Sequence, residues 1–393
     1  MASFAVHPIH RFHGQSQPMR RPKEFTCFSY DDDHKLHLDD RSLRWYYPPQ
    51  YPQADLSRGF ETFDKLDDDG VDEHLDSLLA SVAAHEQKTH TKIDAQVLTW
   101  RGMMTKNHEH KVKSRREQES RQNRPPPRQH PDRPYFPPKV MSYWGYKFEA
   151  LATLPRPWGE VSREEIEARD DQVVSNKAQY CSVVRTGLGS TILCLGGEVD
   201  AVWDAKPQTP GQPIRWVELK TSQDIASERD LEFFEKKLLK FWIQSFLLGV
   251  PTIVVGFRSR QGRLTRLEEI STEGIPGTVI KRAHEQQRPV PPWDGDTCIN
   301  FASSFLGWLR QSVFNVTLDE SGATTGNDGV WRIRRRPGSP EIEVFQVEET
   351  GHGNILPDSF LNWRIKLALG ADTTSGAAED RSAPGEADPG PGS

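Results

Sequence analysis

The stretch bounded by the apolar runs Ile214–Leu219 and Thr252–Phe257 constrains the fold more than any other part of the chain. Both runs have the length and apolar character of buried strands. Between them, the pattern over Asp230–Gly249 places apolar residues at helical spacing on broadly one side, and Gly249 followed by Pro251 is a stop signal. A strand, a long helix and a second strand in this order predict a mixed α/β core.

The residues before this unit extend the same core. Two more strand-like runs lie at Ser190–Leu195 and Val199–Trp203. Leucine and valine recur at helical spacing over Asp72–Val82, with acids in the first turn, which predicts an amphipathic helix. The first 70 residues carry isolated apolar clusters among Pro, Asp and aromatic residues, which suits strands and loops laid over a core.

At 393 residues the chain has room for two average domains, but we expect a single domain over residues 1–370. Within it, residues 111–139 are basic and rich in Pro, which disfavours packing and predicts an exposed loop. The alternative for this loop is a phosphate-contacting arm or a nuclear import signal. Residues 371–393 consist largely of Gly, Ala, Pro, Ser and acids, and we expect this tail to be disordered.

Composition excludes several classes of protein. A net charge of −6 argues against a surface coated in positive charge, so any nucleic-acid contact must come from a local groove. The four cysteines are scattered without a CxxC pair, which offers neither a disulfide framework nor a zinc site and favours a reducing compartment. No apolar run reaches the roughly 20 residues of a membrane helix. We therefore expect a soluble, intracellular protein with no membrane partner.

Polar side chains interrupt two of the apolar strand runs at alternate positions. Glu198 and Asp200 flank Val199, and Glu218 and Lys220 flank Leu219. Residues two apart on a strand are about 6.6 Å apart along the backbone and share one face. Each polar pair is therefore expected on one face, with the central apolar residue pointing the other way. The plain alternative is two surface strands with ordinary exposed acids.

Three carboxylates on adjacent strands repel one another, so such a cluster survives mainly when a divalent cation neutralises it. Oxygen ligands favour Mg²⁺ or Mn²⁺ over zinc. Two such ions roughly 3.5 to 4 Å apart can stabilise both the entering and the leaving oxygen in phosphoryl hydrolysis. Lys220 would then orient or help to deprotonate the attacking water. The pattern predicts a metal-dependent hydrolase of phosphate linkages.

The order Glu-x-Asp, strand, Glu-x-Lys, helix resembles the PD-(D/E)xK nuclease superfamily. The surrounding residues, together with Arg101 in Thr99-Trp100-Arg101-Gly102, resemble more narrowly the ordered motifs of the DXO/Dom3Z decapping-nuclease family, most of all its fungal nuclear members. These motifs are Gly145-Tyr146-Lys147-Phe148-Glu149, Gly197-Glu198-Val199-Asp200, Glu218-Leu219-Lys220 and the helical run from Lys240 to Val250. The resemblance spans roughly residues 20–257.

The resemblance implies a core of two sheets flanked by helices, with the active site in a cleft between them. Glu198, Asp200 and Glu218 resemble metal ligands, the Leu219 backbone carbonyl a further ligand, and Glu149 a ligand reached partly through water. Lys220 and Gln244 would position the water and the scissile phosphate. Arg101 would contact the RNA backbone or the 5′ nucleotide.

The family's activity implies a Mg²⁺- or Mn²⁺-dependent enzyme, with two ions per site, that removes defective 5′ ends from RNA. These ends are a triphosphate, from which pyrophosphate is released, an unmethylated cap and a nucleotide cap such as NAD. Some members are also 5′-to-3′ exonucleases. Fungal members bind and stabilise the nuclear 5′-to-3′ exoribonuclease, which implies a nuclear location. The alternative is that the chain acts mainly as a non-catalytic scaffold for that exoribonuclease.

Four residues on or after the long helix have two interpretations each. Gln244 is either a substrate contact or a polar residue on a core helix. Phe241 and Trp242 suit core packing better than base stacking. Arg258 follows the second strand of the unit and reaches either phosphate or only solvent.

Overall fold

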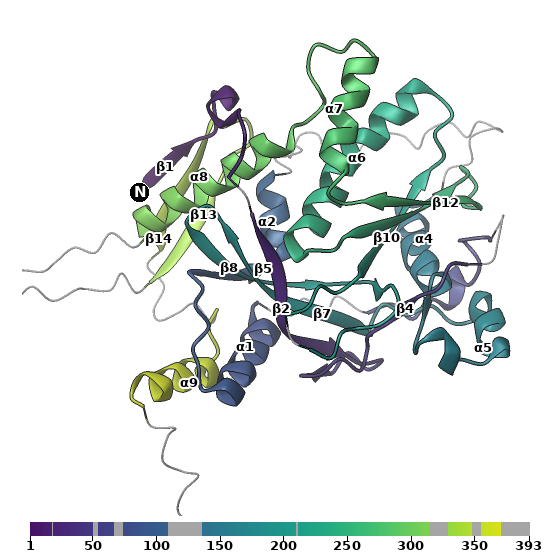
Figure 1. Cartoon of the computed structure of the whole chain (residues 1–393), viewed down its shortest axis with the longest axis horizontal. Helices are drawn as coiled ribbons and strands as arrows, with labels where there is room; N and C mark the ends of the chain where they lie inside the picture. Colours follow the sequence, from purple (N-terminus) through teal and green to yellow (C-terminus); the bar gives the residue numbers. More distant parts are fainter. Residues whose placement is uncertain are drawn as a thin grey trace, which may run out of the picture.

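The computed structural model describes residues 1–17, 19–49, 54–66, 74–108, 136–209, 211–313, 329–347 and 355–370 (Figure 1). The predicted tail and residues 111–135 of the predicted basic loop lie outside the described residues. No helix within the described ranges is both long and apolar enough to cross a membrane.

A six-stranded sheet carries the predicted strand, helix, strand unit. Strands β10 and β11 pair in parallel, and helix α6 (Glu228–Leu248) forms the crossover that a parallel pair requires. The strand order is β12 (Leu264–Ser271), β11 (Thr252–Arg258), β10 (Trp216–Gln223), β9 (Ala201–Val202), β4 (Trp45–Tyr46) and β6 (Thr153–Leu154).

Helix α6 has clear signals at both ends. The Ser227 side chain accepts a hydrogen bond from the Asp230 backbone N–H, which is the usual N-cap contact. Gly249 ends the helix with a φ of 73°, a left-handed conformation that glycine adopts without a Cβ penalty.

A five-stranded sheet faces the first one. It is built around the long hairpin of β7 and β8, and β5 pairs in parallel with β8 before the chain enters helix α2 (Arg101–His108). The strand order is β3 (Leu36–His37), β2 (Arg20–Tyr30), β7 (Gln179–Leu188), β8 (Thr191–Glu198) and β5 (Val97–Trp100).

The main core lies between α6 and the facing sides of these two sheets. It contains Leu195 of β8, Leu238 of α6 and Val255 of β11. Helix α4 (Pro138–Leu151) covers the opposite side of the six-stranded sheet, where its Phe148 packs in one cluster with Leu219. Side chains of β10 therefore alternate between the α4 layer and the space between the sheets.

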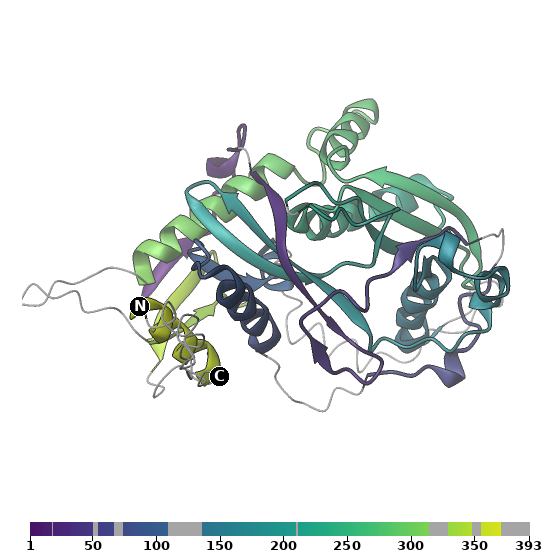
Figure 2. The same ribbon diagram turned by 60° about the horizontal axis from the view of Figure 1, so that its bottom comes forward.

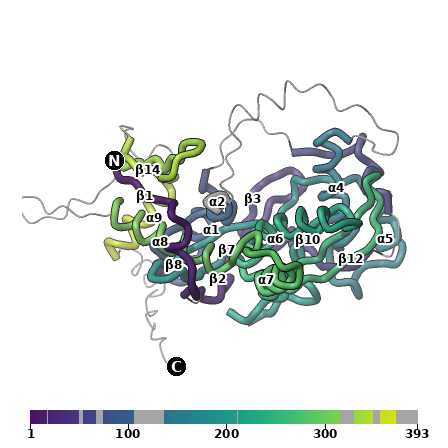
Figure 3. Tube along the Cα trace, turned by 90° about the horizontal axis from the view of Figure 1, so that it is seen from above, coloured from purple at the N-terminus to yellow at the C-terminus, as the bar shows by residue number. Residues whose placement is uncertain are grey.

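The N-terminal strand joins two strands from late in the chain in a three-stranded sheet of order β1 (Ala2–Ala5), β14 (Glu341–Val347) and β13 (Val330–Arg334). Helix α8 (Gly295–Val313) packs on it, and α9 (Asp358–Ala368) packs on α1 (Asp76–Thr89). Figures 2 and 3 place these elements at one end of the molecule and α4 with α5 (Arg163–Glu167) at the other. Helix α7 spans Ile275–Glu285, and short 3-10 turns lie at Ile9–Phe12, Phe60–Thr62, Trp158–Glu160 and Ala168–Asp170.

The mixed α/β fold of two sheets with flanking helices is confirmed, while several boundaries differ from the prediction. The helix predicted over Asp72–Val82 begins at Asp76 and runs to Thr89. The predicted basic loop ends earlier than residue 139, because Pro138 begins α4; a proline suits the first turn, where its missing N–H would have no helical partner. The strand predicted over Val199–Trp203 shrinks to the two residues of β9.

Candidate active site

Glu198 and Asp200 lie where the chain passes from one sheet to the other. Glu198 ends β8 of the five-stranded sheet, and Asp200 immediately precedes β9 of the six-stranded sheet. The prediction that both lie on one strand was wrong, because the strand breaks at Val199, which is buried in the main core. Both carboxylates nevertheless line one pocket, and the buried Val199 between them packs in the main core.

Glu218 and Lys220 occupy alternate positions of β10, as predicted. The Lys220 ammonium lies 2.6 Å from a Glu218 oxygen and 4.0 Å from the Asp200 carboxylate. Arg101, the first residue of α2, donates from its guanidinium to the other Glu218 oxygen at 3.2 Å. The Glu218 side chain is only 1% exposed, so its charge is tolerated because two cations bind it.

Glu149 approaches from the C-terminal part of α4, beyond the short strand β9. Burial, followed by the nearby charges of Asp200 and Glu198, raises the pKa of Glu149 well above its ordinary value. Glu149, Glu198 and Asp200 line one pocket, and the Lys220 ammonium lies near both Asp200 and Glu218, so the structure brings together all four carboxylates singled out in the sequence.

The four acids differ in their response to this environment. Burial and the Glu218 charge raise the pKa of Asp200 from 3.8 to about 7, even though the Leu219 N–H donates to it at 2.6 Å. Desolvation by the surrounding protein also raises the pKa of Glu198, although its side chain still reaches solvent through the pocket that it lines. The pKa of Glu218 is lowered instead, because Lys220 and Arg101 together outweigh its burial. The pKa values of both cations are raised, since the acids outweigh the opposing effect of burial.

The donor set fits a divalent cation. Its four carboxylates outnumber the one ammonium and one guanidinium beside them, which leaves an excess of negative charge that attracts divalent ions. As the side chains stand, no group of three or more His, Cys, Asp or Glu residues within the described ranges is arranged to hold an ion. In this arrangement the carboxylate of Glu218 is bound by the side chains of Lys220 and Arg101.

The Leu219 backbone is consistent with its predicted role as an extra ligand. A residue in a strand directs its N–H and C=O toward the same edge. Because the Leu219 N–H reaches Asp200, the Leu219 carbonyl also points toward the Asp200 side of β10, beyond the paired residues of the short strand β9.

A pocket of about 350 Å³ opens beside the carboxylates. Glu149, Glu198 and Asp200 form one part of its lining, and a second set of polar side chains, which the sequence did not single out, forms another part: Arg41, Arg44, Tyr146 and Gln179. Tyr146 lies one helical turn before Glu149, so the spacing of three residues on α4 was a usable signal. The two arginines come from the loop before β4 and carry no pattern readable in the sequence.

The structure distinguishes the two interpretations given for the residues of helix α6, core packing and substrate contact. Phe241 and Trp242 are buried, and Trp242 stacks on Trp293 at a centroid distance of 5.6 Å, which confirms core packing. Gln244 is half-buried one turn before Leu248, whose side chain reaches the backbone of Gly197. Gln244 thus faces the neighbourhood of the site without lining the pocket.

Comparison with known proteins agrees with this geometry. The model of the RAI1-like PD-(D/E)XK nuclease family matches residues 20–108 and 106–361. The chain is 53% identical to the decapping nuclease RAI1 of Gibberella zeae over 95% of this chain and 100% of that protein.

Solved structures of fungal proteins share the fold. Candida albicans Rai1 in complex with pU5-Mn²⁺ superposes with a TM-score of 0.75 at 28% identity, covering 93% of this chain and 100% of that one. Scheffersomyces stipitis Rai1 in complex with (3′-NADP)⁺ and calcium gives a TM-score of 0.74 at 25% identity, with the same coverage. The chain therefore belongs to the family of RAI1-like PD-(D/E)XK nucleases, as its ordered motifs predicted.

Proposed function

We propose that this enzyme hydrolyses phosphate linkages at the 5′ ends of RNA with two Mg²⁺ or Mn²⁺ ions. Its substrates would be 5′-triphosphate RNA, from which it releases pyrophosphate, and RNA with an unmethylated or NAD cap. The observation that carries this proposal is the convergence of four carboxylates and Lys220 on the crossover between the sheets, beside a pocket.

Each site residue then has a defined task. Glu198, Asp200, Glu218 and the Leu219 carbonyl would hold the ions, with Glu149 reaching them partly through water. When bound, the ions supply charge neutralisation at the phosphate and a more acidic water. Lys220 would orient that water, because its ammonium is fixed by Glu218 at 2.6 Å and remains protonated at neutral pH. Arg101 and Gln244 would contact the RNA.

The solved relatives support this choice of substrate and ion. The Candida albicans protein was captured with a short single-stranded RNA and manganese, and the Scheffersomyces stipitis protein with a dinucleotide related to NAD and calcium. The pocket beside Glu149 carries Arg41 and Arg44, whose guanidinium groups suit the phosphates of a 5′ end.

The test is to incubate the full chain with RNAs bearing triphosphate, unmethylated cap, methylated cap, NAD or monophosphate ends, and to identify each released product. Asp200→Asn and Glu218→Gln should abolish release while preserving the thermal unfolding transition. Asp204→Asn is a matched control, because Asp204 is exposed and contacts only the Arg215 guanidinium and the neighbouring Ala205 N–H among the contacts of the described chain. Full activity of either active-site variant with Mg²⁺ or Mn²⁺ present would refute the proposal.

A second candidate function is stabilisation of the nuclear 5′-to-3′ exoribonuclease, which would place the protein in the nucleus. The observation favouring a protein partner is Trp158, which is 70% exposed between α4 and α5. Exposed tryptophans are frequent anchors of protein interfaces. Trp158→Ala should remove any increase in the exoribonuclease's melting temperature, whereas Asp200→Asn should retain it. If wild-type protein causes no such increase, this second function fails.

A further inference from the structure

One face of α6 combines cations with an exposed aromatic ring. Positions three, four and seven residues apart share a helix face, and here they hold Arg229, Phe233, Lys236, Lys237 and Lys240, which we name the α6 basic face. Phe233 is 52% exposed although it is a large apolar side chain. The Arg229 guanidinium and the Lys236 ammonium lie 5.6 and 5.7 Å from the centre of its ring.

The α6 basic face begins beside the active site. Lys237 donates to the Ser222 hydroxyl at 3.4 Å, and Ser222 continues the β10 face that carries Glu218 and Lys220. Gln244 lies on the same side of α6, seven residues after Lys237. A cavity of about 510 Å³ at this end is lined by Ser222, Lys237 and Lys240 among others.

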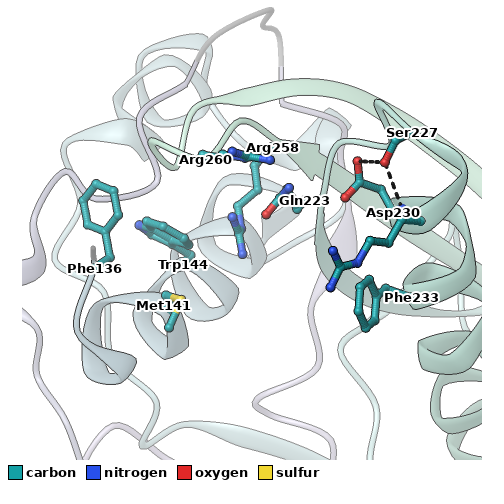
Figure 4. Close-up of a pocket in the computed structure, with 10 residues that line it drawn as sticks. Phe136, Met141, Trp144, Gln223, Ser227, Asp230, Phe233, Arg258 and Arg260 are labelled. Carbon is teal, nitrogen blue, oxygen red and sulfur yellow. Dashed lines mark hydrogen bonds between the residues drawn. The ribbon is translucent and has the colours of Figure 1, made fainter. Parts of the chain in front are cut away.

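A second cavity of about 590 Å³ continues from Phe233 to the ends of β10 and β11. Figure 4 shows Arg258 standing between Trp144 and the Phe233 side of this cavity. The Arg258 guanidinium stacks on the Trp144 ring at 4.2 Å, and its buried Nε has no hydrogen-bond partner in the described chain. Arg260 adds another guanidinium to the lining.

The two acids that line these cavities, Asp224 and Asp230, contact other groups, and the exposed Glu232 lies at the edge of the α6 basic face. Asp230 accepts from the Ser227 hydroxyl at 2.8 Å and from the Ala226 backbone. Asp224 lies 3.5 Å from Arg266. By contrast, no described carboxylate lies within the 4.0 Å of an ion pair from Arg229, Lys236, Lys237, Arg258 or Arg260. Cations therefore outnumber acids on this surface, although the net charge of the chain is −6.

We propose that the α6 basic face and the cavity at Arg258 bind the single-stranded body of the RNA as it leaves the active site. Cations that track a backbone, combined with exposed rings for stacking, are what single-stranded nucleic acid requires, and this combination is independent of sequence. An acidic protein segment would use the cations but not the ring of Phe233. This inference rests on the proposed function, because it assigns the path of that same substrate.

Binding tests the path separately from catalysis. Full-length protein in chelator is titrated into a fluorescent single-stranded RNA of about 20 nucleotides, and anisotropy gives the Kd. Loss of one stacked base corresponds to about tenfold in affinity, so Phe233→Ala should weaken binding by about that factor. Lys236→Ala should weaken binding and reduce its salt dependence by about one charge. Ile365→Ala and Lys281→Ala are matched exposed controls on α9 and α7, and both should bind like wild type.

Equal Kd values for Phe233→Ala, Lys236→Ala and the controls would overturn the proposal. So would competition by polyglutamate at the same charge concentration, because that outcome assigns the surface to an acidic protein. Hydrolysis gives a second readout. The Phe233→Ala substitution should raise KM more for the longer RNA than for a 5′-triphosphate dinucleotide, because only the longer RNA reaches the α6 basic face. If wild type hydrolyses neither substrate, the proposed function fails, while the binding result still decides whether the path exists.

Discussion

Glu218 and Asp200 show how one site can hold acids in opposite states. Glu218 is buried between Lys220 and Arg101, which favour its charged form. Asp200 is desolvated and repelled by Glu218, which favours its protonated form. Without a metal, the site therefore keeps protons at neutral pH that a divalent ion must displace on binding.

The proton held by Asp200 should make the stability of the metal-free protein depend on pH. Asp200 titrates near 3.8 when exposed and at about 7 in the fold. Between these values the folded protein binds more protons than the unfolded chain, so the free energy of unfolding of metal-free protein falls as pH rises from 5 to 7. The slope contributed by one proton is at most about 1.4 kcal/mol per pH unit. Above the pKa of Asp200 in the folded protein, the free energy of unfolding does not fall further through this group.

Urea unfolding of wild type and Asp200→Asn in chelator, at a series of pH values, measures this effect as the difference between the two curves. The wild type should lose stability relative to the variant over this range. Added Mg²⁺ or Mn²⁺ should stabilise wild type more at pH 8 than at pH 5.5, because fewer protons remain to be displaced. A difference curve that is flat across the range contradicts the prediction.

Helix α4 sets the position of Glu149 through its contact with β11. A Cβ built on Gly256 would lie 2.6 Å from the Phe148 ring, so only glycine allows this approach of helix and sheet. Phe148 precedes Glu149 and is fully buried. A side chain at position 256 would therefore move the helix segment that carries the carboxylate.

Gly256→Ala should lower the free energy of unfolding by about 1 to 3 kcal/mol, the usual cost of an overpacked core. It should also lower the hydrolysis rate, because Glu149 shifts. Gly307→Ala on α8 is the control: a Cβ there meets nothing within 4 Å, so replacing a helical glycine should stabilise by about 0.5 to 1 kcal/mol. Chemical denaturation and initial rates measure both effects, and a Gly256→Ala protein with wild-type stability would contradict the packing argument.

At the level of the whole molecule, the chain closes on itself because its first strand pairs with β14. Phe4 of β1 is buried in an aromatic cluster with Phe305 and Trp308 of α8, with ring centroids 5.5 and 5.3 Å away. A residue near the N-terminus thus ties together elements more than three hundred positions apart.

If residues 1–370 form one cooperative domain, Phe4→Ala should shift a single unfolding transition, with a loss of about 3 to 5 kcal/mol. Ser3→Ala, an exposed neighbour on the same strand, should leave the transition in place. Calorimetry checks both variants. A separate early transition in Phe4→Ala, with the catalytic core melting at its wild-type temperature, would show that the end sheet is an independent unit.

Much of this arrangement was predictable, and the exceptions have physical reasons. The strand, helix, strand unit and its stop at Gly249 follow from local pattern, and the acids were found because charge inside apolar strands is costly. The break at Val199 was not predictable, because alternation looks the same when a chain crosses between sheets as when it continues along one. Arg41 and Arg44 reach the pocket only through tertiary packing, whereas the helical spacing of Tyr146 from Glu149 could have revealed it.

The acids near the crossover at Val199 and the side chains that line the neighbouring pocket are under different structural constraints. Three of the four acids in the proposed site, Glu198, Asp200 and Glu218, lie on or directly beside strands that build the core, so a change in their spacing would also disturb folding. The pocket beside them takes Arg41 and Arg44 from the loop before β4, which can vary in sequence without moving those strands. Relatives can therefore diverge in which RNA ends they remove while the bond-breaking chemistry descends unchanged.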